Sequence, residues 1–270
     1  MTRRAEIVGF ISIKGGVGKT TVASNVAYSL ANDMDKRVLL VDGNFSAPTL
    51  NSYFNVIDCD VGLGEVLAGK ARIQNVIRPV LPNLHLLPVH YYNSNVDPKH
   101  MRQALCSLRS NYDFIVIDSS PALNEETLAA IHASDRLFMI TTPDHVTLGS
   151  TMRAVKIAKD GRTPISGIVI NKLRGKHYEI GAKEVAEVTG IPVVSSYTDN
   201  DKVLRSLSDG RLVNVNYPKA DVAHETRRLS YALCGKVYKP YGLFSSIGNM
   251  FSKRVSQANI NRSLLNSDFY

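Results

Sequence analysis

The chain has 270 residues, of which 44% are hydrophobic, 21% charged and 7% aromatic, with no tryptophan. These values are typical of a globular protein with one large or two small domains, and they exclude collagen-like, disordered and coiled-coil classes. The formal net charge of +8 favours an anionic partner surface, either nucleic acid or acidic lipid. Three scattered cysteines predict a reducing cytoplasm, and the seven histidines form no zinc motif. No stretch approaches the ~18 apolar residues that a membrane span needs.

Short aliphatic runs alternate with segments of helical spacing along the first 235 residues. The runs predict strands over Glu6–Ile13, Arg37–Asp42, Leu84–Val89, Phe114–Asp118, Arg136–Thr141, Ile165–Asn171 and Val193–Ser196. The spacing predicts helices over Thr20–Asn32, Pro98–Asn111, Glu125–Ala133, Val146–Lys159, Tyr178–Thr189, Asn200–Asp209 and Asp221–Cys234. This alternation predicts one α/β domain over residues 1–235, with a mostly parallel sheet and helices on both faces. Ligands of such sheets bind beyond the carboxyl ends of the strands.

A glycine-rich loop joins the first predicted strand to the first predicted helix. Its sequence is Lys14-Gly15-Gly16-Val17-Gly18-Lys19-Thr20-Thr21. Glycines let backbone N–H groups surround phosphate oxygens, and the helix N-terminus adds partial positive charge. In such a loop Lys19 reaches the β- and γ-phosphates, and the Thr20 hydroxyl binds Mg²⁺. The sequence therefore predicts a site for nucleotide phosphates and Mg²⁺ over residues 14–21.

Two further strands end in a carboxylate. Val38-Leu39-Leu40-Val41-Asp42 places Asp42 near the metal side of the loop, and Phe114-Ile115-Val116-Ile117-Asp118 has the Walker B form. We expect Asp118 to hold a Mg²⁺-bound water, the alternative being a turn or helix-cap residue. Asp42 and Thr20 complete the predicted metal site.

The loop departs from the strict GxxxxGK[ST] pattern, because Ile13 occupies the first glycine position and a second lysine, Lys14, is present. This form resembles the MinD/ParA family of P-loop ATPases, and the resemblance extends over roughly residues 6–235. It implies the three-layer P-loop NTPase fold and an ATP-dependent homodimer in which Lys14 reaches the partner's phosphates, as an arginine finger does. It also implies that Asn171 recognises adenine, a simple turn residue being the alternative. Residues 191–207 would close the base pocket, although Thr198 stands where the family usually has proline.

One departure from the family concerns catalysis. The first switch of the family usually reads Asp-x-Asp, and its second acid positions the attacking water, whereas this chain has Asp42-Gly43-Asn44. An asparagine cannot take up a proton, but its oxygen can still orient a water. We therefore expect slow ATP hydrolysis and a long-lived ATP dimer. The alternatives are that Asp42 positions the water and hydrolysis is normal, or that the chain is a nucleotide sensor with hardly any turnover.

The last 35 residues form a basic tail, residues 236–270. Their basic residues are Lys236, Lys239, Lys253, Arg254 and Arg262, and their one acid is Asp268. The apolar residues of the predicted helix 243–255 fall within an arc of about 140°. They are Leu243, Phe244, Ile247, Met250, Phe251 and Val255. With Lys253 and Arg254 beside them, they predict an amphipathic membrane helix, placed as in MinD proteins. The alternatives are docking of this helix on its own domain or on a partner, and a disordered tail.

The sequence thus predicts a cytoplasmic, peripherally membrane-associated ATPase switch. It would dimerise on ATP, bind an anionic membrane surface and position a division site, motility machine or other polar assembly, through an unknown activating or cargo protein. A ParA-like partition ATPase that binds DNA without sequence preference is the second choice. Its basic candidates are the loop Lys172–His177 and the helix residues Arg153, Lys156 and Lys159. A metal-insertion or electron-transfer ATPase is the third, although it lacks a cysteine pair near a switch.

Overall fold

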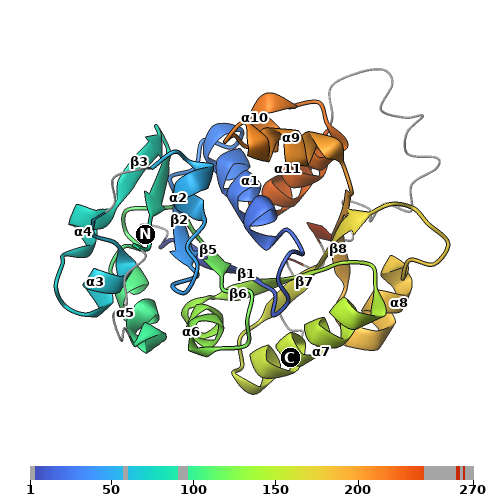
Figure 1. The fold of residues 1–270 in the computed structure, drawn as a ribbon, viewed down its shortest axis with the longest axis horizontal. Helices are drawn as coiled ribbons and strands as arrows, with labels where there is room; N and C mark the ends of the chain where they lie inside the picture. Colours follow the sequence, from blue (N-terminus) through green and yellow to red (C-terminus); the bar gives the residue numbers. More distant parts are fainter. Residues whose placement is uncertain (1–3, 57–59, 91–96, 240–259, 262–263, 265–270) are drawn as a thin grey trace.

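The computed structural model describes residues 4–56, 60–90, 97–239, 260–261 and 264. Its centre is an eight-stranded sheet with the order β3-β4-β2-β5-β1-β6-β7-β8 (Figure 1). Every neighbouring pair is parallel except β3 and β4. The strands are β1 (Glu6–Ile11), β2 (Val38–Gly43), β3 (Arg78–Leu81), β4 (Leu84–Leu87), β5 (Phe114–Ser119), β6 (Arg136–Thr141), β7 (Ile165–Leu173) and β8 (Val193–Thr198). The predicted α/β fold is confirmed.

All seven predicted strands are present, and β3 is the strand that the sequence analysis missed. It contains Pro79, which lacks a backbone N–H and is therefore confined to edge strands. Its side chains alternate between half-buried and exposed, unlike the fully buried β2 and β5. Such a short, partly exposed edge strand, with an arginine and a proline among its four residues, gives no continuous apolar run in the sequence.

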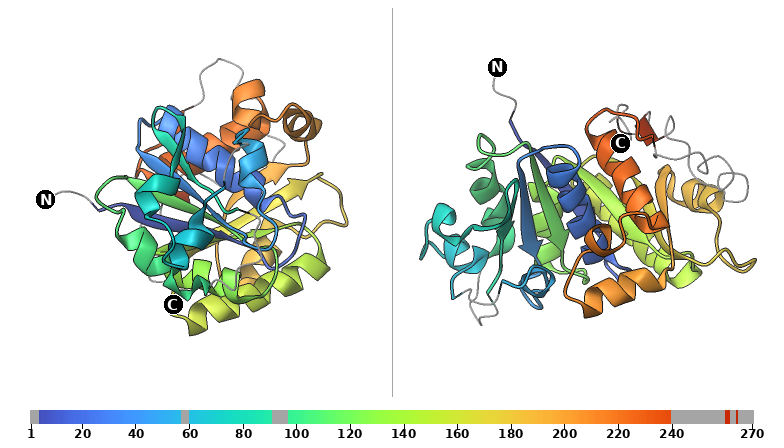
Figure 2. Two further views of the ribbon diagram at one scale, coloured as in Figure 1. Left: turned by 60° about the vertical axis from the view of Figure 1, so that its left-hand side comes forward. Right: turned by 90° about the horizontal axis from the view of Figure 1, so that it is seen from above.

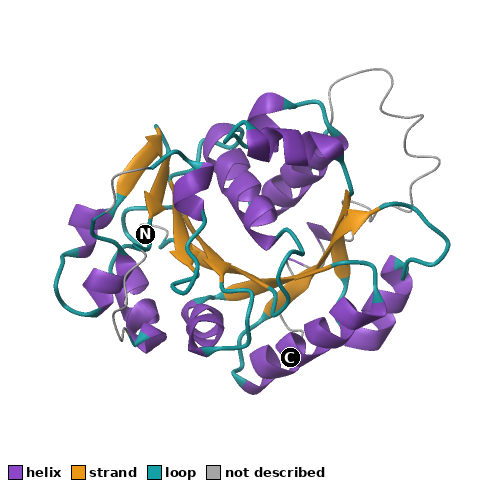
Figure 3. Ribbon diagram, in the orientation of Figure 1, coloured by secondary structure: helices purple, strands orange, loops and turns teal. Residues whose placement is uncertain are grey.

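The helices fill the connections between strands (Figure 3). They are α1 (Lys19–Asn32), α2 (Leu50–Tyr53), α3 (Leu63–Leu67), α4 (Ile73–Val76), α5 (Met101–Cys106), α6 (Glu125–Ala133), α7 (His145–Asp160), α8 (Ala182–Thr189), α9 (Asp201–Ser208), α10 (Val213–Asn216) and α11 (Asp221–Leu233), with a 3₁₀ turn at Pro98–His100. The helix predicted over Pro98–Asn111 is shorter than expected, and α8 starts later than Tyr178 because Gly181 occupies its N-cap.

Helices cover both faces of the sheet, giving three layers (Figure 1). α1, α9, α10 and α11 lie on one face, and α6, α7 and α8 lie on the other. The core is correspondingly divided in two. Along β1, Ile7 and Ile11 join one hydrophobic cluster while Val8 and Phe10 join the other, as the alternation of side chains along a strand requires. Phe10 stacks on Phe138 with ring centroids 5.4 Å apart.

The chain returns to this core near its C-terminus. Ile260 and Leu264 are fully or nearly buried and belong to the cluster on the α1 and α11 face. A guanidinium nitrogen of Arg136 donates to the backbone oxygen of Leu264 at 3.2 Å. Residues 260 and 264 therefore pack on the α/β domain, and they belong to the stretch 236–270 that we predicted as a basic tail. The predicted amphipathic helix 243–255 lies outside the described residues. Within the described part of the chain, no helix is long and apolar enough to cross a membrane.

Candidate nucleotide site

The glycine-rich loop follows β1 and leads into α1, as predicted. Gly16 and Gly18 have positive φ angles of 77° and 86°, which turn successive backbone N–H groups toward one side. Gly18 is the N-cap of α1, and no side chain caps that helix end. The N–H groups of the first turn therefore remain available to an anion such as a phosphate. Gly15, Val17, Thr20 and Thr21 lie on the same loop and first turn.

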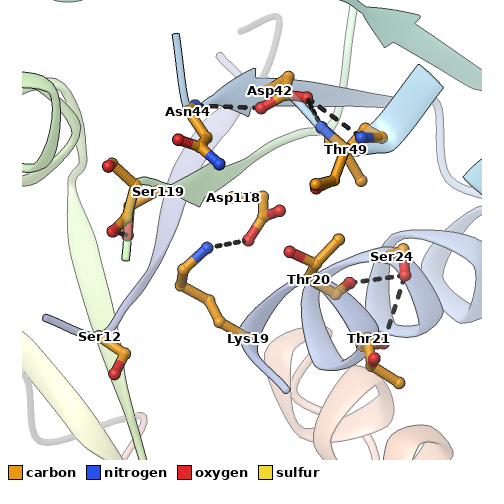
Figure 4. A network of polar contacts seen from close by, with 12 residues as sticks. Ser12, Lys19, Thr20, Thr21, Ser24, Asp42, Asn44, Thr49, Asp118 and Ser119 are labelled. Carbon is orange, nitrogen blue, oxygen red and sulfur yellow. Dashed lines mark hydrogen bonds and ion pairs between the residues drawn. The ribbon is translucent and has the colours of Figure 1, made fainter. Parts of the chain in front are cut away.

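Lys19 and Asp118 form a buried ion pair at the centre of the site. The ammonium Nζ of Lys19 donates to Oδ1 of Asp118 over 2.6 Å, and the two side chains are 6% and 0% exposed. Figure 4 shows the pair beside Thr20, the first residue of the loop with a hydroxyl. The pair joins the N-terminus of α1 to the carboxyl end of β5. Without a nucleotide, Lys19 and Asp118 neutralise each other's charge. Either charge alone would be strongly destabilising in this buried position.

Asp42 and Asn44 order the loop that follows β2. The Asp42 carboxylate accepts hydrogen bonds from the backbone N–H groups of Asn44, Thr49 and Leu50 at 3.0–3.1 Å. Burial, with the neighbouring charge of Asp118, raises the pKa of Asp42 to about 7 against the effect of these bonds. The Asn44 side-chain amide donates to the backbone oxygen of Ala47. Asp42 and Asp118 are cross-strand neighbours, so the predicted metal and switch residues converge at one point (Figure 4).

Two buried oxygens at this point have no hydrogen-bond partner among the described residues. They are Oδ2 of Asp118 and Oδ1 of Asn44. No group of three or more His, Cys, Asp or Glu side chains that could hold a metal occurs in the described part of the chain. Mg²⁺ needs no such group, because it takes one or two carboxylates and completes its shell with phosphate and water oxygens. Asp118 and the Thr20 hydroxyl therefore fit Mg²⁺, which when bound neutralises charge on the phosphates.

The Lys14 side chain makes its contacts with the start of α7 and not with the rest of the phosphate loop. Its ammonium donates to the hydroxyl of Thr147 at 2.8 Å and lies 3.8 Å from a carboxylate oxygen of Asp144, at the start of α7. The Lys14 side chain is 39% exposed. Asp144 is the N-cap of α7, and its Oδ1 accepts from the Thr147 backbone N–H at 2.8 Å. The sequence analysis missed that the same cap also holds Lys14, because the two segments are more than 100 residues apart.

Asn171 contacts the phosphate loop and lines a hollow beside α1. Its Nδ2 donates to the backbone oxygen of Val17 at 2.7 Å, and its Oδ1 accepts from its neighbour Lys172. The hollow is also lined by Thr21, Asn25, Tyr197, Thr198, Val203 and Leu204. One amide N–H and one oxygen lone pair of Asn171 remain for a base edge. The segment 191–207, which we expected to close a base pocket, borders this hollow, and Thr198 stands in its wall.

Gly18→Ala is expected to weaken nucleotide binding more than Gly16→Ala does. A Cβ at residue 18 would lie 2.2 Å from Nδ2 of Asn171, whereas one at residue 16 meets nothing within 4 Å. Both changes incur the left-handed backbone penalty of about 1–2 kcal/mol, but Gly18→Ala also displaces an amide contact worth about 1 kcal/mol. Titration with a fluorescent ADP analogue measures the difference. Equal affinities of the two variants would show that Asn171 does not fix the loop.

Comparison with known proteins places these features in a family. A sequence model described as an AAA domain matches residues 5–160. An ATP-binding protein of Methanocaldococcus jannaschii is 25% identical over 88% of this chain and 91% of its own length. The septum site-determining protein MinD of Synechocystis is 24% identical over 76% of this chain and 80% of its own length.

Solved structures agree with these sequence matches. The cell division ATPase MinD of Pyrococcus furiosus is 26% identical, with a TM-score of 0.79 over 84% of this chain and 97% of that one. The septum site-determining protein MinD of Pyrococcus horikoshii, solved with Mg-ADP, is 24% identical and shares the fold, with a TM-score of 0.80 over 92% of this chain and 99% of that one. The chain belongs to the MinD/ParA family of P-loop ATPases, whose cofactors are ATP and Mg²⁺.

Proposed function

We propose that the chain is an ATP-dependent dimerising switch that cycles on an anionic membrane surface to position a cellular structure. The observation that carries the proposal is the position of Lys14. This lysine belongs to the phosphate loop, is 39% exposed, and its ammonium contacts Asp144 and Thr147 at the start of α7 and not the buried Lys19–Asp118 pair. A cation that its own site does not use is available to a second copy of the chain, where it would act in trans.

The functional roles follow from the placement of the side chains. Lys19 and the backbone of residues 15–18 bind the phosphates, Thr20 and Asp118 hold Mg²⁺, and Asp42 orders the switch loop near the metal. Thr21 and Asn171 border the base site. Lys14 completes the partner's site, so nucleotide binding and dimerisation become one event. The membrane contact is assigned to the tail residues Leu243, Phe244, Ile247, Met250, Phe251, Lys253 and Arg254, which lie outside the described residues. Pairing two weak membrane helices in a dimer multiplies their avidity.

Lys14→Ala tests the dimerisation step. We expect the full-length wild type to become a dimer with Mg-ATP and to remain a monomer with Mg-ADP, as measured by light scattering after gel filtration. Lys14→Ala should bind ATP and stay monomeric. A suitable control is Lys176→Ala, which removes an exposed lysine at the same carboxyl side of the sheet. ATP-dependent dimerisation of Lys14→Ala would refute the role in trans.

Flotation with vesicles tests the membrane step. The full-length protein should float with vesicles that contain phosphatidylglycerol when ATP is present, and less when ADP replaces it. The double substitution Phe244→Asp/Phe251→Asp should abolish flotation while dimerisation persists. Retention on double-stranded DNA without flotation would favour the ParA-like alternative, for which the exposed Lys172–His177 loop and the exposed face of α7 supply positive charge.

Asn44→Asp is expected to accelerate ATP hydrolysis, about tenfold or more, because a positioned carboxylate adds base character that an amide lacks. The backbone N–H of Asn44 bonds to Asp42 and would do so in the variant as well. The side-chain bond to Ala47 would be lost, so the switch loop must tolerate that change. Phosphate release under single-turnover conditions measures the rate. An unchanged or lower rate would show that position 44 does not limit hydrolysis.

A further inference from the structure

Among the described residues, the loop that follows β2 (residues 44–49) has one hydrogen bond to a distant part of the chain. Its other hydrogen bonds in that part of the structure stay inside residues 42–52. The exception is the Ser46 hydroxyl, which donates to Oε1 of Glu126 in the first turn of α6. Because the same loop carries Asn44, whose oxygen we expect to orient the attacking water, the bond to Glu126 holds a segment that matters for hydrolysis.

The carboxylate of Glu126 has no cation as a partner in the described part of the chain. None of the ion pairs there includes it, and its second oxygen, Oε2, is buried without a hydrogen-bond partner. A carboxylate accepts a hydroxyl hydrogen bond more strongly than a neutral oxygen does, and the N-terminus of α6 favours its negative charge. We therefore expect the bond from Ser46 to be strong, although Ser46 itself is exposed.

The first turn of α6 also holds the loop that follows β5. The hydroxyl of Thr127 lies 3.1 and 2.7 Å from the backbone oxygens of Ser120 and Ala122. Farther along α6, Ile131 is fully buried in the hydrophobic cluster that also contains residues of β1, β2 and β5. The left-hand view of Figure 2 shows this helical layer below the sheet, with α1 in blue above it. The helix is thus a fixed support for any loop that is bonded to its first turn.

We propose that Glu126 is a positioning residue for ATP hydrolysis, which acts through Ser46 to hold Asn44 in place beside Asp118. One helical turn then fixes the loops that follow both carboxylates of the site, because Thr127 holds the loop after β5 and Glu126 the loop after β2. The inference rests on the proposed function, since it takes ATP hydrolysis as the step that needs this alignment.

The effect of Glu126 should fall on the rate of hydrolysis and not on nucleotide binding. Without the bond, residues 44–49 can shift relative to Asp118, and a displacement of about 1 Å of a positioning group can cost about 10²-fold in rate. The phosphates are bound by residues 15–19, which belong to the loop before α1 and make no hydrogen bond to Ser46 or Glu126 within the described residues. The affinity for nucleotide should therefore stay unchanged.

A double-mutant cycle on the bond tests the proposal. Glu126→Ala, Ser46→Ala and the double variant are compared in the full-length chain by phosphate release under single-turnover conditions. Each single variant should be about tenfold slower than the wild type. The double variant should be no slower than either single variant, because both substitutions remove the same bond. Titration with a fluorescent ADP analogue should give affinities within about twofold of the wild type, which separates a positioning role from damage to the site.

Two further variants control for charge and for helix stability. Glu126→Gln keeps an oxygen that can accept from Ser46, so its rate should return to within about threefold of the wild type. Glu125→Ala removes the same charge from the neighbouring, exposed position of the same helical turn, and it should change the rate by less than about twofold. Thermal unfolding of all variants checks that α6 is intact.

The outcomes separate this inference from the proposed function. If the wild type hydrolyses ATP and Glu126→Ala is as fast as Glu125→Ala, the positioning role is wrong and the switch function stands. A double variant about 100-fold slower than the wild type would show that Glu126 does not act through Ser46. A Glu126→Gln variant as slow as Glu126→Ala, or loss of ATP-dependent dimerisation in Glu126→Ala, would likewise overturn the inference. If the wild type is no faster than Asp118→Ala, both proposals fall.

Discussion

Asp118→Ala is expected to destabilise the nucleotide-free protein by about 3–5 kcal/mol and to abolish ATP hydrolysis. The substitution leaves the Lys19 ammonium, which is 6% exposed, without its carboxylate partner. Breaking a buried ion pair costs this much because the remaining charge stays desolvated. Hydrolysis is lost because the same carboxylate faces the proposed magnesium position. Urea unfolding without nucleotide measures the first effect, and steady-state phosphate release the second.

A double substitution separates the lost ion pair from the lost side-chain volume. Lys19→Met/Asp118→Ala removes both charges, and we expect it to recover most of the stability that Asp118→Ala loses. Glu187→Ala is the matched surface control, because its ion pair with Lys183 is 65–91% exposed and should contribute less than about 1 kcal/mol. A double variant that is as unstable as Asp118→Ala would indicate that packing, and not charge, dominates at this position.

Leu264→Ala and Ile260→Ala are each expected to lower the free energy of unfolding by about 2–5 kcal/mol. The two side chains are 5% and 0% exposed within the hydrophobic cluster on the α11 face. Val237→Ala provides the control, since Val237 is 56% exposed and its truncation should stay within about 0.5 kcal/mol. Losses below about 1 kcal/mol at both positions would show that residues 260 and 264 are not part of the folded core.

This prediction determines how the tail can be studied. A chain that ends at Lys239 lacks Ile260 and Leu264 together with the amphipathic segment. Loss of membrane binding in such a truncation would therefore have two causes, a missing membrane segment and a damaged core. Substitutions within residues 243–255 change the first and leave the second intact, which is why the flotation test uses Phe244→Asp/Phe251→Asp.

The sequence predicted the sheet and the phosphate loop because both depend on local patterns. Strands buried on both faces read as continuous apolar runs, and the loop residues are contiguous from Lys14 to Thr21. The edge strand β3 gave no such run, and four-residue helices such as α2 are too short for apolar periodicity. Contacts between residues far apart in the chain could not be predicted from the sequence either. The Lys14–Asp144 contact and the burial of Leu264 are examples, since neither leaves a pattern in neighbouring residues.

The clustering of charged residues in the fold is likewise not visible in the sequence. Half of the net charge lies in the last 35 residues, which directed attention to the tail. Three hollows at the amino ends of the strands are lined by arginines that come from separate segments, namely Arg4, Arg102, Arg109, Arg136 and Arg162. Each looks like an ordinary surface residue in the sequence. Only the parallel sheet, which brings the amino ends of its strands to one edge, places them together.

The buried pair of Lys19 and Asp118 has a consequence for ligand selectivity. When the Lys19 ammonium turns from Asp118 toward a phosphate, the Asp118 carboxylate needs a new cation, because its side chain is wholly inaccessible to water. Binding of a nucleotide without its metal would leave the buried Asp118 carboxylate without a cation. Binding of the metal without a nucleotide would leave the buried Lys19 ammonium without an anion. The affinities for phosphate and magnesium should therefore be positively linked, so that the protein distinguishes Mg-ATP from either component alone.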